Sequence, residues 1–225
     1  MLKNYFPSTN YDFFKYLTPG FTLLFGLDIV LNGGTILKTP LTLQAWIMAF
    51  ALAYLSGHLI AEFSQRILEH FLSNILNLNP ISLLIEHTSS QNFFNWLLTG
   101  YYKILSPEKR QQILNNFPNQ KATQFFRDVY LESKKIPGPQ KRLKKLKNQY
   151  ELARNLTLAV LIIGMAGFGT HVRSLWHGFG GYPATHWLYI DFAFFLGGVL
   201  YLRYLKFFAK FTLEAYINFP TENPQ

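Results

Sequence analysis

Cysteine is absent from this chain of 225 residues. Disulfides and thiolate metal sites are therefore excluded, although the redox compartment stays open. Acidic residues are scarce as well, because 12 Asp and Glu stand against 21 Lys and Arg. In a soluble protein this balance would indicate a polyanionic partner such as nucleic acid. In a membrane protein it has a second meaning, since Lys and Arg are retained in cytoplasmic loops.

The motifs of common enzymes are missing too. The chain has no Gly-rich phosphate loop, no His-Glu-x-x-His helix, no nucleophile elbow and no carboxylates paired at a useful spacing. We therefore expect a non-enzymatic protein without a cofactor. A cleavable signal is not expected either, because Pro19 and Gly20 interrupt the first apolar run.

Long apolar runs are what the chain does have. Residues 41–63, 152–170 and 187–202 carry almost no charge, whereas residues 105–151 are rich in Lys, Arg, Asn and Gln. A bilayer hydrocarbon core of about 30 Å requires about 20 mostly apolar residues in a helix. The runs approach this length, and they predict an integral membrane protein.

The predicted fold is an all-α, polytopic membrane bundle of about four transmembrane helices. The spans are expected near residues 11–31, 41–62, 152–171 and 186–206. Whether the first span crosses the membrane depends on Pro19. Thr18 and Pro19 are also typical of the start of a helix, and a helix that began there would be too short to cross the bilayer. We prefer a span that begins near Tyr11 and is kinked at Pro19, since neighbouring helices can satisfy the freed backbone groups.

Basic residues are distributed unevenly over the loops. With four spans, only Lys38 and Arg173 fall on one side, and every other Lys and Arg falls on the opposite side. This predicts a plasma or inner membrane protein with both termini and a basic helical insert in the cytoplasm. Helices two to four are expected to continue past the bilayer into a cytoplasmic helical cap. The predicted regions are an N-terminal membrane region, the insert, and a C-terminal membrane region with a cytoplasmic tail, at 1–62, 63–150 and 151–225.

Ionisable residues at helical spacing mark the second span. Five residues follow one another every four positions and share one helix face: Tyr54, His58, Glu62, Arg66 and His70. Polar groups near the cytoplasmic ends of the third and fourth spans should lie at a similar depth. The sequence therefore predicts a polar intramembrane layer of His58, Glu62, Arg66, Arg154, Asn155 and Arg203. It is interpreted either as an ion-pair network that fixes helix register or as a lining for an ion, a proton or an anionic headgroup.

Two further clusters flank the membrane. A basic run leads into the third span and predicts contact with anionic lipid or an anionic ligand, through Lys141, Arg142, Lys144, Lys145 and Lys147. The loop on the other side has nitrogen and oxygen donors suited to zinc, namely His171, His177, His186 and Asp191. Their spacings match no compact metal motif, and histidines beside tryptophans also suit the membrane interface, so no metal is predicted.

The preferred function is a non-enzymatic membrane effector, sensor or channel-like component. It is expected to form homo-oligomers and to respond to a cytoplasmic protein or an anionic small molecule. Two alternatives stay open: a small ion or solute transporter that uses His58, Glu62 and Arg203, and an interfacial lipid-modifying enzyme centred on His58 and Glu62. In architecture alone, the chain is similar to small bacterial inner-membrane proteins, including membrane effectors of phage-defence systems, and this similarity assigns no residues.

Overall fold

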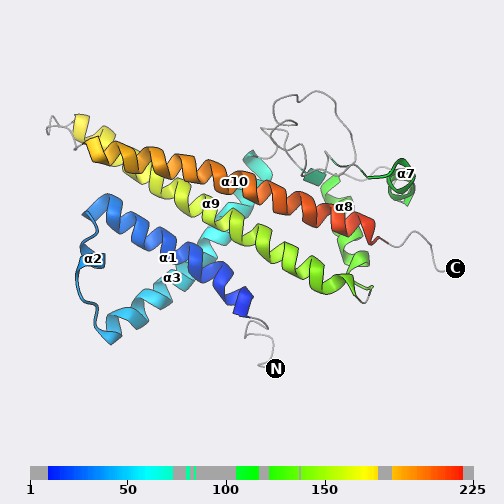
Figure 1. Cartoon of the computed structure of the whole chain (residues 1–225), viewed down its shortest axis with the longest axis horizontal. Helices are drawn as coiled ribbons and strands as arrows, with labels where there is room; N and C mark the ends of the chain where they lie inside the picture. The colour runs from blue at the N-terminus through cyan, green and yellow to red at the C-terminus, as the bar shows by residue number, and fades with distance from the viewer. Residues whose placement is uncertain are drawn as a thin grey trace. The chain divides into compact units, whose positions relative to one another are not determined.

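A computed structural model of the chain describes residues 10–72, 80–81, 84, 105–116, 122–136, 138–176 and 184–219. These residues form helices joined by turns, and no strand occurs among them. The helices shown in Figure 1, with a π-helix η2 that continues α3, are α1 (Asn10–Asn32), α2 (Thr35–Lys38), α3 (Leu43–Ser64), η2 (Gln65–Leu72), α7 (Pro107–Asn116), α8 (Ala122–Ser133), α9 (Pro139–Trp176) and α10 (Ala184–Ile217).

Four of these helical segments are long and apolar enough to cross a membrane. By length and composition, the candidate spans are Phe13–Asn32, Leu43–Glu69, Pro139–Trp176 and Trp187–Ile217. For the described residues, the prediction of an all-α fold with four helices long and apolar enough to span a membrane is therefore confirmed. The cytoplasmic location of the insert and the termini stays a prediction.

The chain divides into two compact units. The first unit consists of Met1–Phe71 and Glu151–Arg203, and the second consists of Leu72–Tyr150 and Tyr204–Gln225. Three helices contribute residues to both units: α9, α10 and, through Leu72 alone, η2. The long α9 helix begins directly after Gly138, whose φ of 114° is a conformation that glycine adopts without steric penalty.

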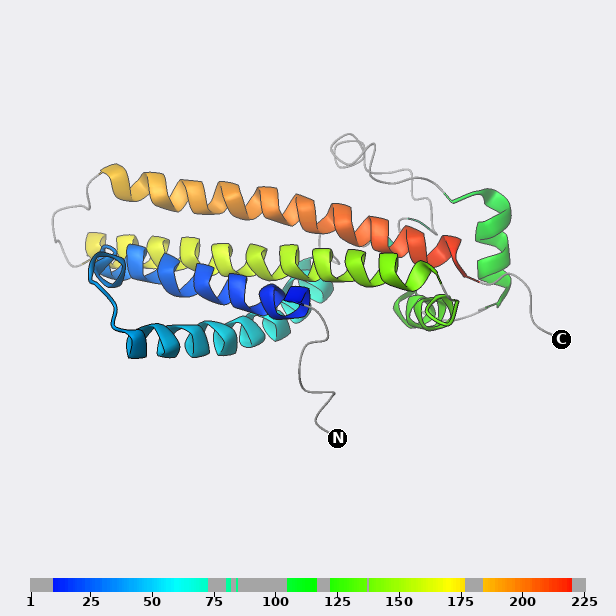
Figure 2. The same ribbon diagram turned by 60° about the horizontal axis from the view of Figure 1, so that its bottom comes forward.

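In the first unit, α1 and α3 pack with their backbones in close contact. A Cβ atom at Gly20 would lie 1.7 Å from the carbonyl oxygen of Ala53, and one at Gly57 would lie 1.9 Å from that of Tyr16. Small residues permit such close approach between membrane helices, where van der Waals packing drives association. Figure 1 and Figure 2 show α1 crossing α3.

The α9 helix lies against both α1 and α10 in the same unit, again through glycines. A Cβ atom at Gly26 of α1 would lie 2.2 Å from Ile163 Cδ1 of α9. A Cβ atom at Gly197 of α10 would lie 2.9 Å from Leu161 Cδ2, whereas one at Gly198 would meet nothing within 4 Å. Of this glycine pair, Gly197 therefore serves packing within the chain.

The second unit has an aromatic core where α8, the start of α9 and the end of α10 meet. The ring of Phe211 lies 5.3 Å from that of Tyr130, 5.3 Å from that of Tyr150 and 5.7 Å from that of Phe126. The buried Ser133 hydroxyl donates to the carbonyl oxygen of Ala215 at 2.7 Å, which ties α8 to α10.

Candidate functional site

Arg154 on α9 is the centre of a buried polar network in the first unit. Arg154 is only 5% exposed, and its guanidinium forms an ion pair with the Glu69 carboxylate of η2. Its Nε donates to the Ser64 hydroxyl at 3.0 Å, and its Nη2 donates to the carbonyl oxygen of Ala61 at 3.4 Å. A charge among apolar helices is tolerated only with such partners.

Asn155 extends the network from α3 to α1. The Ser64 hydroxyl donates to the Oδ1 atom of Asn155 at 2.7 Å. The Nδ2 atom of Asn155 donates to the carbonyl oxygen of Lys15 at 3.4 Å. That carbonyl would normally accept the N–H of the residue four positions later, which is Pro19 and has none. Asn155 therefore replaces the missing helical donor, as expected for proline in a packed membrane helix.

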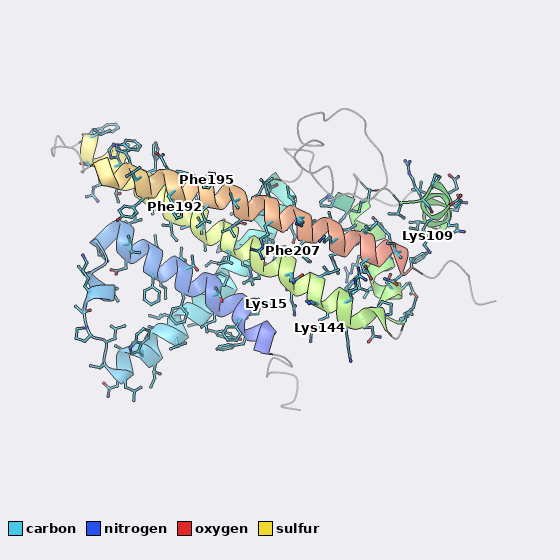
Figure 3. The ribbon with its side chains drawn as sticks, in the orientation of Figure 1. Lys15, Lys109, Lys144, Phe192, Phe195 and Phe207 are labelled. Carbon is cyan, nitrogen blue, oxygen red and sulfur yellow. The ribbon has the colours of Figure 1, made fainter. Side chains whose placement is uncertain are left out.

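A second ion pair completes the network. The Lys15 ammonium of α1 lies 2.8 Å from the Glu151 carboxylate of α9. Figure 3 labels Lys15. Both side chains are largely buried, at 14% and 16% exposure. We call the whole network the ionic layer and define it as Lys15, Ser64, Glu69, Glu151, Arg154 and Asn155. It contains two acids and two bases, so its formal charge is balanced.

The π-helix explains why Glu69 belongs to the ionic layer. Ser64 and Glu69 both contact Arg154, although they are five positions apart. In an α-helix, residues five apart point about 140° away from each other. A π-helix closes its hydrogen bonds over five residues, which brings such positions to one side. The η2 segment therefore turns Glu69 toward Arg154.

Two of the predicted residues, Glu62 of α3 and Arg66 of η2, lie on the outer surface of the first unit. The Glu62 carboxylate pairs with Arg66 at 2.9 Å, and these side chains are 63% and 72% exposed. His58 is also exposed and stacks on the Tyr16 ring at 3.9 Å. Arg203 is exposed on α10. Of the six predicted layer residues, Arg154 and Asn155 belong to the ionic layer, whereas Glu62 and Arg66 pair with each other.

Four members of the ionic layer were missing from the predicted site: Lys15, Ser64, Glu69 and Glu151. Glu69 was missed because a constant spacing of four was assumed, and nothing in the local composition signals a π-helix. Lys15 and Glu151 lie near the ends of their apolar runs, where charges are ordinary. Lys15, Glu151 and Arg154 all lie at the predicted cytoplasmic ends of the first and third spans. This shared position was the signal that could have predicted their contact.

The predicted basic run lies on the part of α9 that belongs to the second unit. Lys141, Arg142, Lys144 and Lys145 are exposed. Arg142 lies 3.2 Å from the Glu214 carboxylate, and the Lys147 ammonium lies 5.6 Å from the centre of the Tyr130 ring. The run therefore presents positive charge on a helix whose other side is fixed to the second unit.

The structure describes only part of the predicted cluster of His171, His177, His186 and Asp191. His171 is buried on α9, with its ring 3.9 Å from that of Trp187, and Asp191 is exposed on α10. His177 and the side chain of His186 lie outside the described residues. Within the described part of the chain, no three His, Cys, Asp or Glu side chains gather as a metal site.

The ionic layer pairs its charges with one another. Each acid has a basic partner and each polar group of Asn155 contacts another helix, so α1, α3 and α9 are held in one register. Such an arrangement suits a structural lock or a conformational switch, because movement of any one helix separates charges in a poorly solvating environment.

Comparison of the chain with protein-family models, with curated proteins and with solved structures found no match. Function is therefore argued from the helices and the ionic layer themselves.

Proposed function

We propose that this chain is a non-enzymatic membrane effector or sensor, whose second unit receives a signal and whose membrane-spanning helices respond to it. The observation that carries the proposal is the continuity of α9. This helix runs unbroken over 38 residues and supplies residues to both compact units. A helix is stiff along its axis, so a shift or rotation at one end is transmitted to the other.

The ionic layer supports the proposal through its place on α9. Glu151 is the first α9 residue of the first unit, and Arg154 and Asn155 follow within one turn. These three side chains bind α1 and the α3–η2 helix. Movement of α9 would therefore act on both of these helices at once. A tightly packed contact of this kind tends to have discrete arrangements instead of deforming continuously.

In this proposal, the second unit and both termini lie in the cytoplasm of a plasma or inner membrane. The signal is a cytoplasmic protein or an anionic small molecule. The exposed basic residues of α9 support an anionic signal, because Lys and Arg attract phosphate and carboxylate groups.

Flux through liposomes tests the proposal. Purified protein is reconstituted, and release of potassium and of a small anionic dye is measured for the wild type and for Arg154→Met. Loosening the ionic layer should raise flux by about ten-fold or more, which corresponds to about 1.4 kcal/mol in the closed-to-open equilibrium. Lys135→Met is the matched control, because its ion pair with Glu132 is exposed and lies in the second unit. Folding is checked by far-ultraviolet circular dichroism.

Three outcomes would replace this proposal. Folded Arg154→Met protein with the same flux as the wild type would remove the role of the ionic layer. Saturable uptake driven by an ion gradient would support a transporter instead. Turnover of a labelled lipid that is lost in His58→Ala would support a lipid-modifying enzyme.

A further inference from the structure

The outer surface of α3 carries a continuous seam of exposed side chains. We define the α3 seam as Met48, Ala51, Leu55, His58 and Glu62, which are separated by alternating steps of three and four residues and are all exposed. This alternation is the repeat by which one helix packs along another over several turns. The buried side of α3 is different, because Ala53, Gly57, Ile60 and Ser64 face the rest of the first unit.

The polar end of the α3 seam lies within the apolar length of the span. The candidate span Leu43–Glu69 has 27 residues. A bilayer core takes up about 20 of them. His58 and Glu62 are included wherever a stretch of that length is placed within the span. The Glu62 side chain, and the part of His58 that the stacked Tyr16 ring leaves exposed, would therefore face hydrocarbon or its boundary if nothing covered α3.

Ionisable side chains in membrane spans rarely face lipid, and they pair with one another or face a protein interior. Glu62 does pair with Arg66 at the start of η2, but both side chains are more than half exposed. On α10, Phe192 and Phe195 present apolar rings outward, which suit lipid (Figure 3). The part of α10 around Phe195 therefore serves as a lipid-facing reference for the α3 seam.

We propose that two copies of this chain associate side by side through the α3 seam. The charges carry this assignment, because Glu62 and Arg66 present one acid and one base on the same surface, one turn apart. The 2.9 Å ion pair holds the guanidinium of Arg66, the second residue of η2, at the level of Glu62. Around a two-fold axis, each Glu62 then meets the partner copy's arginine, and the four charges balance.

The apolar part of the α3 seam fits the same partner. Leu55 is 61% exposed. Met48 is exposed two turns closer to the helix start, and the small Ala51 lies one turn before Leu55, between the two larger side chains. A small residue at the centre of a seam lets two membrane helices approach closely. The inference needs only a bundle that spans the membrane, so it does not rest on the proposed signalling function.

Single-cysteine cross-linking tests the seam directly, because the chain contains no cysteine of its own. Leu55→Cys and Phe195→Cys are compared in liposomes under mild oxidation, since both residues are apolar and exposed in a candidate span. Leu55→Cys should give a disulfide-linked dimer at least about ten-fold faster than Phe195→Cys, because only the seam holds the sulfurs within reach of each other. Equal rates at the two positions, or no dimer from Leu55→Cys, would overturn the proposal.

Charge reversal supplies a second, independent readout. Glu62→Arg places like charges together and should weaken dimerisation by at least about ten-fold, as counted from subunits in single liposomes. The double variant Glu62→Arg with Arg66→Glu restores one acid and one base and should recover dimerisation. A monomeric wild type, or a double variant as weak as the single one, would contradict the proposal. A monomer whose seam is quenched by headgroup-labelled lipid would assign the seam to lipid.

Discussion

Asn155 donates a 3.4 Å hydrogen bond from its side chain to the backbone carbonyl of Lys15, which Pro19 leaves without a helical donor. The contact joins α9 to α1 at the position where α1 is weakest as a helix. It also explains how a proline is kept in the middle of a span, because the donor that proline lacks comes from another helix.

Asn155 and Pro19 should therefore be energetically coupled. Asn155→Leu should destabilise the wild type by about 1–2 kcal/mol, because it leaves polar groups of two helices unsatisfied. The same change should cost less in a Pro19→Ala background, by about 0.5–1 kcal/mol, since alanine restores the N–H that the Lys15 carbonyl accepts. Unfolding in mixed detergent micelles, followed by circular dichroism, measures the four free energies. Strictly additive costs would rule out the coupling.

The buried ion pair should matter far more than an exposed one. Arg154→Met leaves Glu69 buried without its partner and should destabilise the protein by about 3–5 kcal/mol. Lys135→Met removes an ion pair with Glu132 that is 70% and 42% exposed, and it should cost about 0–1 kcal/mol. Adding Glu69→Leu to Arg154→Met should recover part of the loss. Similar unfolding free energies for Arg154→Met and Lys135→Met would contradict the ionic layer.

Two glycines should respond oppositely to alanine. Gly57→Ala forces a methyl group against the Tyr16 carbonyl and should cost about 1–3 kcal/mol through overpacking. Gly198→Ala places its methyl group in open space, so it should be neutral or stabilise α10 by up to about 1 kcal/mol. Thermal unfolding in detergent compares them. A neutral Gly57→Ala would mean that α1 and α3 lie further apart.

Loss of the aromatic core should affect the second unit first. Phe211→Ala removes ring contacts with Phe126, Tyr130 and Tyr150, and it should destabilise that unit by about 3–5 kcal/mol. Amide hydrogen exchange should then speed up in α8, while α3 keeps its protection, because separate compact units can open separately. The exposed Phe195→Ala is the control. Equal deprotection of α8 and α3 would indicate a single cooperative unit.

The sequence by itself determined the class of fold. Apolar runs of bilayer length form packed or membrane-spanning helices, so composition predicted three of the four spans directly. The fourth followed once a helix kinked at Pro19 was accepted. The sequence also identified Arg154 and Asn155, because polar groups inside such a run must find partners. The start of α1 near Tyr11, ahead of Pro19, was predicted because a helix that began at Pro19 would be too short to cross a bilayer.

Only the tertiary structure decided which charges meet. A spacing of four places His58, Glu62 and Arg66 on one face of a helix, but it does not say whether that face points inward, and it points outward. The local change to a π-helix turns Glu69 inward instead. The physical reason is that periodicity fixes the angles between side chains along one helix. The rotation of that helix about its axis depends on its neighbours, here on the close glycine contact between α1 and α3.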